Sequence, residues 1–229
     1  MKHSISGKTR VCGIIGDPIE HTMSPAIHNA AFAKMGLDYV YIAFRVKPEE
    51  LDKAIKGVRA LNMRGLSVTI PHKVAVLKLL DKLDPLAEKI GAVNTIVNDD
   101  GVLTGYNTDA TGFLQAMLER GVEPKGKNIA ILGAGGASRA VSFILADRGA
   151  NLVILNRRLE LDWAVELARR ISQAFNRKVE ALELTRDNLI KALEKAEILV
   201  NATSVGMSPN SNETPVPSDL LRPGLIVYD

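Results

Sequence analysis

Short apolar runs rich in β-branched residues alternate with helical patterns along nearly the whole chain, and this alternation restricts the fold more than any other feature. In the first half the expected strands are Val11–Ile15, Tyr39–Val46, Leu66–Ile70 and Val93–Val97, with helices beginning near Pro25, Pro48, Lys73 and Pro85. The last strand runs through "NDDG" into "VLTGYN", which predicts a hairpin. Alternating strands and helices are typical of α/β proteins with a largely parallel sheet. We therefore expect an α/β fold whose first sheet is mixed.

The pattern starts again after a helix at about 110–119 and the connection "RGVEPKGK", whose Gly and Pro suit a helix stop. Five further strands are expected in "NIAILG", "NLVILNR", residues 178–184, "AEILVNAT" and "GLIVYD", with helices between the first four. This order is that of a Rossmann-like dinucleotide-binding fold. We therefore expect two α/β lobes, residues 1–110 and residues 111–229, with a small-molecule site between them, where such sites commonly lie.

Composition excludes several classes of function. The 229 residues are 46% hydrophobic and carry a formal net charge of only +3, which favours neither nucleic acid nor an anionic membrane as the main partner. No apolar run approaches the roughly 18 residues of a membrane span, and "MKHSISGKTRVCGIIGD" lacks a signal-type apolar core. Cys12 is alone, and His21 and His28 have no companion ligands, so we expect neither a disulfide nor a metal site. These features predict a soluble cytoplasmic protein.

The stretch "ILGAGGASRA" follows a strand and opens a helix. Gly133 and Gly135 match the first two glycines of G-x-G-x-x-G, whose tight turn lets a pyrophosphate approach the free amides at a helix N-terminus. Ser138 stands at the third position, although Gly136 and Ala140 keep the helix start small. Glycine-rich turns also occur at other strand–helix junctions, but this context favours a dinucleotide along Gly133, Ala134, Gly135, Gly136 and Ala137.

The end of the next strand indicates which dinucleotide binds. An NAD site usually has Asp or Glu about twenty residues after the glycines, facing the ribose, whereas this chain has Asn156, Arg157 and Arg158. Guanidinium groups suit a 2′-phosphate, so NADP is preferred, with use of NAD left open and a solvated basic loop as the alternative. In "VNATSVGM" the fourth strand of this lobe is expected to end at Thr203, followed by Ser204, on the nicotinamide side. An ordinary polar turn explains these two residues equally well.

The first lobe carries a candidate anion site in "HTMSPAIHNAAFAKMG". Ser24 is expected to cap a helix that starts at Pro25 and ends before Gly36. With Thr22 it would lie among free amides at the helix N-terminus, where a carboxylate can bind. Capping alone explains Ser24, but it does not explain Thr22.

Lys73 follows the short strand of "GLSVTIPHK", which Pro71 ends. A cation in the first turn of a helix opposes the dipole by about a few tenths of a kcal/mol, so a carboxylate partner is expected. Asp109 in "GYNTDATGF" is the candidate, with capping of its own helix as the alternative, and Asn94 in "GAVNTI" lies at the same junction of the lobes. A Lys–Asp pair could manage a proton while a cofactor carries hydride. These residues predict an NADP-linked oxidoreductase acting on a small carboxylate or polyhydroxy substrate.

Seven stretches together resemble the shikimate dehydrogenase family: "HTMSPAIHN", "GLSVTIPHK", "GAVNTI", "GYNTDATG", "GAGGASRA", "NRR" and "NATSVGM". Any one of them would be weak, but all seven in family order over almost the whole chain are specific. The resemblance implies an enzyme that reversibly reduces 3-dehydroshikimate to shikimate with NADPH, on the route to chorismate and the aromatic amino acids.

The resemblance also implies roles for individual residues. Lys73 would be catalytic, hydrogen-bonded to the reacting oxygen and paired with Asp109. Thr22 and Ser24 would bind the substrate carboxylate, and its ring hydroxyls would be bound by Ser67, Thr69, Asn94 and Asp109. The cofactor would be held by residues 133–137, by Asn156, Arg157 and Arg158, and on the nicotinamide side by Thr203 and Ser204.

Three features depart from the family. Ser67 stands where the family usually has Asn, so one ring contact is expected to be altered. "NRR" replaces the commoner "NRT", and a double arginine also occurs in relatives that oxidise quinate. The chain stops at "VYD", before a segment that in relatives carries a substrate-contacting Tyr and Gln, so we expect a fragment or a shortened protein.

Three alternatives therefore stay open. One is a quinate/shikimate dehydrogenase with relaxed NAD and NADP use. Another is a non-catalytic NADP-binding module, if the C-terminal segment is truly absent. The third is a different two-lobed NADP enzyme, such as a methylene-tetrahydrofolate dehydrogenase, against which Thr22, Ser24, Lys73 and Asp109 argue. The sequence does not fix the oligomeric state, and a homodimer is one arrangement to test.

Overall fold

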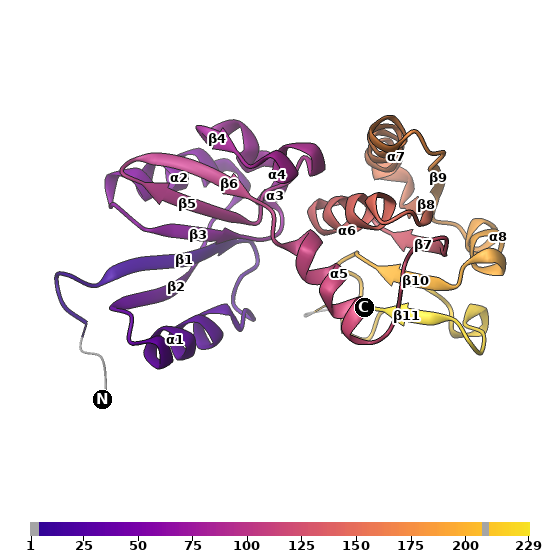
Figure 1. The fold of residues 1–229 in the computed structure, drawn as a ribbon, viewed down its shortest axis with the longest axis horizontal. Helices are drawn as coiled ribbons and strands as arrows, with labels where there is room; N and C mark the ends of the chain where they lie inside the picture. The colour runs from indigo at the N-terminus through magenta and orange to yellow at the C-terminus, as the bar shows by residue number, and fades with distance from the viewer. Residues whose placement is uncertain (1–4, 208–210) are drawn as a thin grey trace. The chain divides into compact units, whose positions relative to one another are not determined.

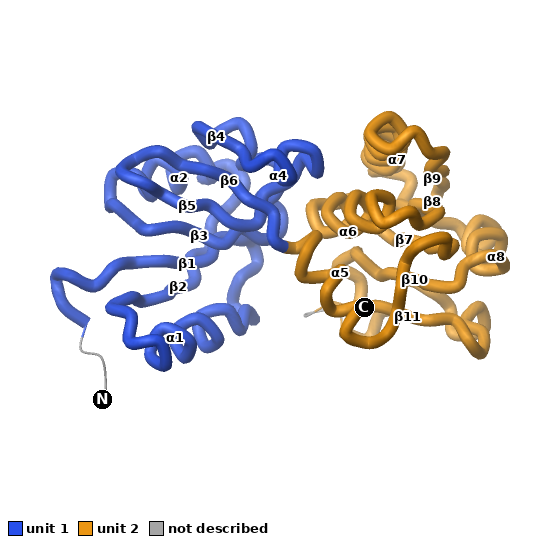
Figure 2. Tube along the Cα trace, viewed as in Figure 1, with its two compact units in different colours: residues 1–108 blue, residues 109–229 orange. Residues whose placement is uncertain are grey.

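The computed structural model describes residues 5–207 and 211–229, and the chain divides into two compact units. The first unit is residues 1–108 and the second is residues 109–229 (Figure 2). Each unit has a sheet of its own with helices packed on it (Figure 1). The expected α/β class with two lobes, one of them with a mixed sheet, is confirmed.

The sheet of the first unit is mixed. In spatial order its strands are β2 (Tyr39–Arg45), β1 (Arg10–Gly16), β3 (Gly65–Val68), β5 (Thr95–Asp99), β6 (Val102–Tyr106) and β4 (Lys82–Leu83). The strands β2, β1 and β3 run parallel, whereas β5 is antiparallel to both of its neighbours. The β5–β6 pair is the expected hairpin, and it turns through Asp100 and Gly101, both with positive φ. Its tight turn returns the chain beside β5.

Helices cover both faces of this sheet. Ile14 and Ile15 point to opposite faces of β1, because successive side chains of a strand alternate. Ile14 packs in a cluster with Tyr41 and with Phe32 of α1 (Ser24–Met35). Ile15 belongs to the larger core, which includes Ile55 of α2 (Leu51–Ala60). The short helices α3 (His72–Ala75) and α4 (Pro85–Ile90) complete the unit.

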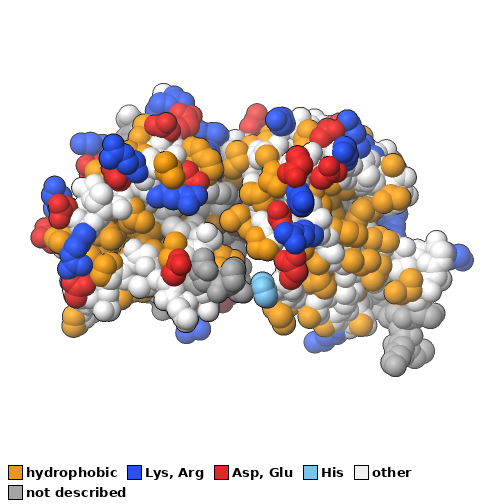
Figure 3. Space-filling view, turned by 180° about the vertical axis from the view of Figure 1, so that it is seen from behind, with side chains coloured by type: hydrophobic (Ala, Val, Ile, Leu, Met, Phe, Trp, Pro, Cys, Tyr) orange, Lys and Arg blue, Asp and Glu red, His pale blue; other side chains and the backbone are white. Residues whose placement is uncertain are grey.

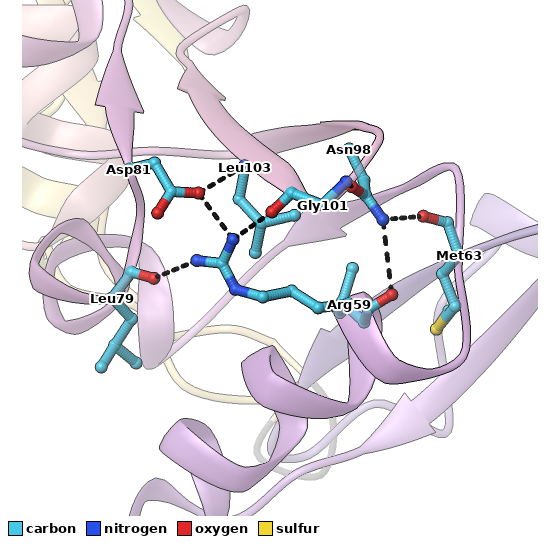
Figure 4. A network of polar contacts seen from close by, with 8 residues as sticks. Arg59, Met63, Leu79, Asp81, Asn98, Gly101 and Leu103 are labelled. Carbon is cyan, nitrogen blue, oxygen red and sulfur yellow. Dashed lines mark hydrogen bonds and ion pairs between the residues drawn. The ribbon is translucent and has the colours of Figure 1, made fainter.

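A polar network ties α2 to the β5–β6 hairpin (Figure 4). Arg59, near the end of α2, donates to the Asp81 carboxylate at 2.6 Å and to the carbonyl of Gly101. The same carboxylate oxygen accepts from the backbone N–H of Leu103 at 2.7 Å, and the amide oxygen of Asn98 accepts from the N–H of Gly101 at 2.9 Å. Hydrogen bonding from Arg59 is the main cause that lowers the pKa of Asp81. The network fixes the hairpin turn to the helix.

The sheet of the second unit is wholly parallel. In spatial order its strands are β11 (Ile226–Tyr228), β10 (Ile198–Asn201), β7 (Asn128–Leu132), β8 (Asn151–Asn156) and β9 (Glu180–Glu183). The connecting helices are α6 (Gly136–Asp147), α7 (Leu161–Phe175) and α8 (Arg186–Lys195), and α5 (Asp109–Glu119) precedes them. The chain winds from β7 through β8 to β9 and then crosses to the other side of β7, so the strand order reverses between β7 and β10. Dinucleotides bind at such a reversal in Rossmann-like folds.

Parallel strands buried on both faces read as continuous apolar runs, which is why this sheet was predictable. In β7 the residues Ile129, Ile131 and Leu132 are all at most 1% exposed. Leu132 packs in a cluster with Leu189 and Leu193 of α8. The helix α6 contacts β7 as well, so β7 packs against two of the connecting helices.

Several expected boundaries were wrong by one or two residues, each for a local reason. The helix α1 starts at Ser24 itself, with Met23 at the cap position, because the Thr22 hydroxyl accepts from the Ser24 N–H at 3.3 Å. Ser24 is therefore not the cap. The strand β10 ends at Asn201 rather than Thr203, because the Asn201 side chain accepts from the Thr203 N–H at 3.1 Å and turns the chain.

Two differences concern the sheet of the first unit. The strand expected at Val93–Val97 begins only at Thr95, since the N–H of Val93 donates to the carbonyl of Lys73 at 2.8 Å instead of to a strand. The two-residue strand β4 was not expected at all, because it is defined only by its pairing with β6.

Candidate functional site

The segment after β3 forms a sharp turn that leads to Lys73, the lysine predicted to be catalytic. The strand ends at Val68, the N–H of Thr69 still donates to the carbonyl of Ile15 at 3.0 Å, and a cis peptide bond joins Ile70 to Pro71. The N–H of His72 then donates back to the carbonyl of Thr69 at 2.9 Å and opens α3. Lys73 is thereby held in a tight turn at the end of a central strand.

Two contacts fix the backbone of this turn. His72 is 1% exposed, and its Nε2 donates to the carbonyl of Val46 at 2.7 Å. The carbonyl of Lys73 accepts from the N–H of Val93 at 2.8 Å. The backbone of Lys73 is therefore held by hydrogen bonds on both sides. Sequence reasoning missed His72, since its partner lies in another strand connection.

Gly16 determines how closely Thr69 can approach β1. A Cβ added at Gly16 would lie 2.5 Å from the methyl carbon of Thr69 and 3.0 Å from the carbonyl oxygen of Ile70. The first distance is shorter than real Cβ contacts and the second is tighter than most of them, so only glycine fits without displacing the segment that leads to Lys73. This contact could not be predicted, because "GDP" indicates only the end of a strand.

Ser67 lies on β3 in register with Ile14 on one side and Thr95 on the other. The hydroxyl of Tyr41 donates to Ser67 Oγ at 2.7 Å, reaching across β1. Tyr41 is 5% exposed and its pKa is raised by burial. Its ring stacks on His28 of α1 with centroids 4.2 Å apart. Ser67 and His28 are half-buried on either side of the buried Tyr41, in a row that the sequence did not reveal.

Asn29 locks this row to α1. Its side-chain amide donates to the carbonyl of Tyr41 at 2.9 Å, and its oxygen accepts from the N–H of Tyr41 at 2.9 Å. Because β2 is an edge strand, these two backbone groups have no neighbouring strand to pair with. The amide of Asn29 takes that strand's place and sets the position of α1.

Thr22 and Ser24 do lie together, as expected. The hydroxyl of Thr22 donates to Ser24 Oγ at 3.1 Å, and both side chains are only partly buried. They stand at the N-terminus of the twelve-residue α1, where the Ser24 N–H donates to Thr22, Pro25 has no N–H and the Ile27 N–H donates to the carbonyl of Met23. The Ser24 hydroxyl keeps its own hydrogen to donate, and the positive end of the helix dipole favours an anion such as a carboxylate here.

Asn94 has a structural role in the first unit. Its side-chain oxygen accepts from the N–H of Thr108 at 2.9 Å and from the hydroxyl of Thr95 at 3.0 Å. Asn94 thus holds the turn just before Asp109, which is the first residue of α5. Since Lys73 belongs to the first unit and Asp109 to the second, their pairing stays a prediction, as do the contacts of Asn94 and Thr69 with substrate.

The glycine-rich turn lies at the strand reversal of the second unit. Gly133 has φ +97, and a Cβ there would lie 3.0 Å from the carbonyl oxygen of Ala202 after β10. Ser138, which replaces the third glycine of the motif, is fully buried and its hydroxyl donates to the carbonyl of Gly133 at 2.6 Å. The serine therefore braces the turn. Gly135 precedes α6 and faces open space, where a pyrophosphate can reach the amides.

The other expected cofactor residues lie at the same carboxyl edge of this sheet. Asn156 ends β8, is 5% exposed, and donates to the carbonyl of Glu160 at 2.8 Å, while Arg157 and Arg158 are exposed after it. Thr203 is in contact range of Gly133, with its methyl carbon 3.1 Å from the Cβ that Gly133 lacks, and Ser204 is exposed beside it. The donors present suit the phosphates of NADP.

Other classes of site find no support in the described residues. Among residues 5–207 and 211–229, no three His, Cys, Asp or Glu side chains lie close enough to hold a metal ion. None of the helices described is long and apolar enough to cross a membrane. Acidic and basic side chains are interspersed over the face seen in Figure 3, so that face carries no continuous basic patch.

The chain is similar to known proteins over almost its whole length. Residues 14–96 match the model of the shikimate dehydrogenase substrate binding domain. A shikimate dehydrogenase (NADP(+)) of Methanopyrus kandleri is 48% identical over 228 residues, covering 99% of this chain and 78% of the relative. One from Moorella thermoacetica is 47% identical over 226 residues, covering 98% of this chain and 76% of the relative. The crystal structure of shikimate 5-dehydrogenase from Listeria monocytogenes in complex with shikimate and NAD superposes with TM-score 0.86 at 44% identity, covering 99% of this chain and 80% of that one.

Proposed function

The chain belongs to the shikimate dehydrogenase family, and from that premise we propose that it interconverts 3-dehydroshikimate and shikimate with NADP(H). The observation that carries the proposal is the identity of 47% and 48% to two enzymes named for this activity, over nearly the whole chain. The seven motifs of the sequence belong to the same family. The reaction belongs to the route to chorismate and the aromatic amino acids.

We propose that the first unit binds the substrate. Thr22 and Ser24 at the start of α1 would bind its carboxylate, supported by their shared hydrogen bond of 3.1 Å and by their place at the N-terminus of the helix. Ser67, Thr69 and Asn94 of this unit, together with Asp109 at the start of α5, would bind the ring hydroxyls. A carboxylate held at one end and hydroxyls at the other would orient the ring for reaction.

Lys73 is the residue we propose for proton transfer. In the direction of reduction the ketone oxygen gains a proton, which the lysine ammonium gives, and in oxidation the hydroxyl proton returns to the amine. The nicotinamide cofactor supplies the hydride when it is bound. The anchored backbone of Lys73 supports this role, because His72 and Val93 hold the turn from two sides. Asp109 would hold the ammonium in place.

The second unit would bind the cofactor along Gly133 to Ala137, with Asn156, Arg157 and Arg158 at the adenosine end and Thr203 and Ser204 at the nicotinamide end. The named relatives use NADP, while the Listeria structure contains NAD with shikimate. Use of NAD by this chain, and oxidation of quinate, remain the alternative within the family. We also propose a cytoplasmic enzyme that works without nucleic acid, with a homodimer as the arrangement to test by light scattering.

The test is a turnover assay on the whole protein with shikimate and NADP⁺, which should produce NADPH absorbance. Lys73→Ala should lower kcat by about 10²–10⁴-fold, with substrate binding largely kept. Lys78→Ala, which removes an exposed lysine five residues away, is the matched control and should leave kcat unchanged. Wild-type turnover in the Lys73 variant would refute the assigned role.

Two further comparisons separate the alternatives. Turnover of shikimate and quinate, each with NADP⁺ and NAD⁺, distinguishes a shikimate dehydrogenase from a quinate/shikimate dehydrogenase of relaxed cofactor use. Thermal stabilisation by NADP⁺ without any stabilisation by shikimate or any turnover would instead indicate a non-catalytic NADP-binding module.

A further inference from the structure

A carboxylate is folded onto the arginine that is expected to hold the adenosine phosphate. Arg157 Nε donates to Glu160 Oε2 at 2.8 Å, and Arg157 Nη2 donates to the other carboxylate oxygen, so the pair is bidentate. The Glu160 side chain is 24% exposed, whereas that of Arg157 is 67% exposed. The guanidinium therefore faces solvent with one of its edges already filled by a protein carboxylate.

The backbone fixes the position of Glu160. Its N–H donates to the carbonyl of Arg157 at 3.0 Å, and its own carbonyl accepts from the side chain of Asn156 at 2.8 Å. Asn156 is 5% exposed and is the last residue of β8. The backbone of Glu160 is thus held in the turn that follows β8, which keeps its side chain beside Arg157.

Two opposite signals for cofactor choice meet in this turn. An acidic side chain after the second strand of such a fold accepts from the ribose 2′-hydroxyl of NAD, and a basic one binds the 2′-phosphate of NADP. Here Arg157 and Glu160 stand together, and Arg158 is exposed, with no ion pair found for it in residues 5–207 and 211–229. A 2′-phosphate that approaches Arg157 must displace the carboxylate or lie beside it, and two anions on one guanidinium repel each other.

We propose that Glu160 is a specificity-determining residue, which occupies Arg157 and so lowers the preference of this protein for NADP over NAD. The inference rests on the proposed function, since it assumes that the adenosine end of the cofactor lies at residues 156–158. Arg157 and Arg158 still attract a phosphate, but the carboxylate offsets one of the two positive charges. The Glu160 carboxylate can also accept a hydrogen bond from the 2′-hydroxyl of NAD, and it does so with a full negative charge. A glutamine amide at this position would carry no charge.

The experiment compares Glu160→Gln with Glu166→Gln. Glu166 also forms a bidentate pair with an arginine, here Arg169 three residues after it, with both distances 2.8 Å, but it lies within α7, six residues after Glu160. Dissociation constants are measured by calorimetry for NADP⁺ and NAD⁺, and for the half-molecules 2′-phospho-AMP and AMP. These binding data need no turnover, so they do not depend on Lys73 or on the substrate.

Removing the negative charge that occupies Arg157 should tighten the binding of NADP⁺ and 2′-phospho-AMP by about tenfold. NAD⁺ and AMP should bind equally or more weakly, and the control should change neither pair. Glu160→Ala removes the same charge and gives the same test if the glutamine variant does not fold. The inference is overturned if the ratio of the NADP⁺ and NAD⁺ dissociation constants in Glu160→Gln stays within twofold of wild type. It is also overturned if Glu166→Gln shifts this ratio equally. Either result leaves the proposed function standing. If wild type binds neither dinucleotide, the proposed function fails and the inference with it.

Discussion

Replacement of Gly16 by alanine tests whether the packing behind Thr69 controls the position of Lys73. The added methyl group would stand 2.5 Å from the Thr69 methyl carbon, 3.0 Å from the Ile70 carbonyl oxygen and 3.1 Å from Ile19. Ordinary contact begins at 3.4 Å, so the Thr69 segment has to move by about 1 Å. Overpacking of this kind costs about 1–3 kcal/mol of folding free energy.

The same shift should cost more in catalysis than in stability. The turn from Thr69 to Lys73 is short and anchored by His72, so displacement of its first residue is passed to the lysine. A catalytic group misplaced by about 1 Å can lose about 10²-fold in rate. We therefore expect Gly16→Ala to lower kcat/KM by about a hundredfold, and to lower the melting temperature by about 4–8 °C for each kcal/mol lost in a unit of this size.

Steady-state kinetics and thermal melts of three variants measure these effects. Gly57→Ala is the matched control, because a Cβ at this helical position in α2 meets nothing within 4 Å, and it should be neutral or slightly stabilising. The double variant Gly16→Ala with Thr69→Ser removes the nearest methyl carbon and keeps the hydroxyl, so it should recover part of the lost activity. A folded Gly16→Ala protein with wild-type kcat/KM, or a double variant no better than the single one, would refute the reasoning.

Two further predictions concern the first unit. Tyr41→Phe removes the donor to Ser67 and keeps the ring on His28, so the free energy of unfolding in urea should fall by about 1 kcal/mol. The KM for shikimate should rise severalfold with little change in kcat. Tyr39→Phe on the same strand is the control, and equal effects of the two variants would contradict the prediction. The pKa of Asp81 is lowered in the folded state, so its stabilising effect is complete above the unfolded pKa of about 4 and is lost as the pH falls through the lower folded pKa. Melting temperatures of Asp81→Asn and wild type should therefore differ at pH 7 and converge in acid, whereas a difference that does not depend on pH would exclude this linkage.

The sequence predicts those parts of the fold whose pattern is local. The strands β7 and β8 are continuous apolar runs because both faces are buried, and the hairpin of β5 and β6 has its own turn residues in "NDDG". The strand β4 has only two residues and exists because β6 offers it a partner, so no local pattern could reveal it. Capping was also misassigned at Ser24, since α1 begins one residue earlier than expected and Met23 takes the cap position.

The candidate site divides in the same way. Lys73, Thr22 and the turn of Gly133 could be found because motifs place them at strand ends and helix starts, and the positive φ of Gly133 agrees with the tight turn that was expected. Their supporting contacts could not be found, because each joins residues that are distant in the chain. The partner of His72 is the carbonyl of Val46, and the partner of Ser67 is the hydroxyl of Tyr41.

Two polar groups of the proposed site share one physical feature. Ser67 accepts from Tyr41, and Arg157 in "NRR" is paired with Glu160, so each polar group meets a partner from its own unit before any ligand arrives. A hydroxyl that already accepts from Tyr41 has its own hydrogen left to donate, and a guanidinium that already holds a carboxylate has less charge to offer a phosphate. We therefore expect substrate and cofactor choice at these positions to depend on the residue pairs. The substitution Ser67→Asn alone would bring a larger amide against the Tyr41 hydroxyl. Its effect on specificity must therefore be compared with that of changing Ser67 and Tyr41 together.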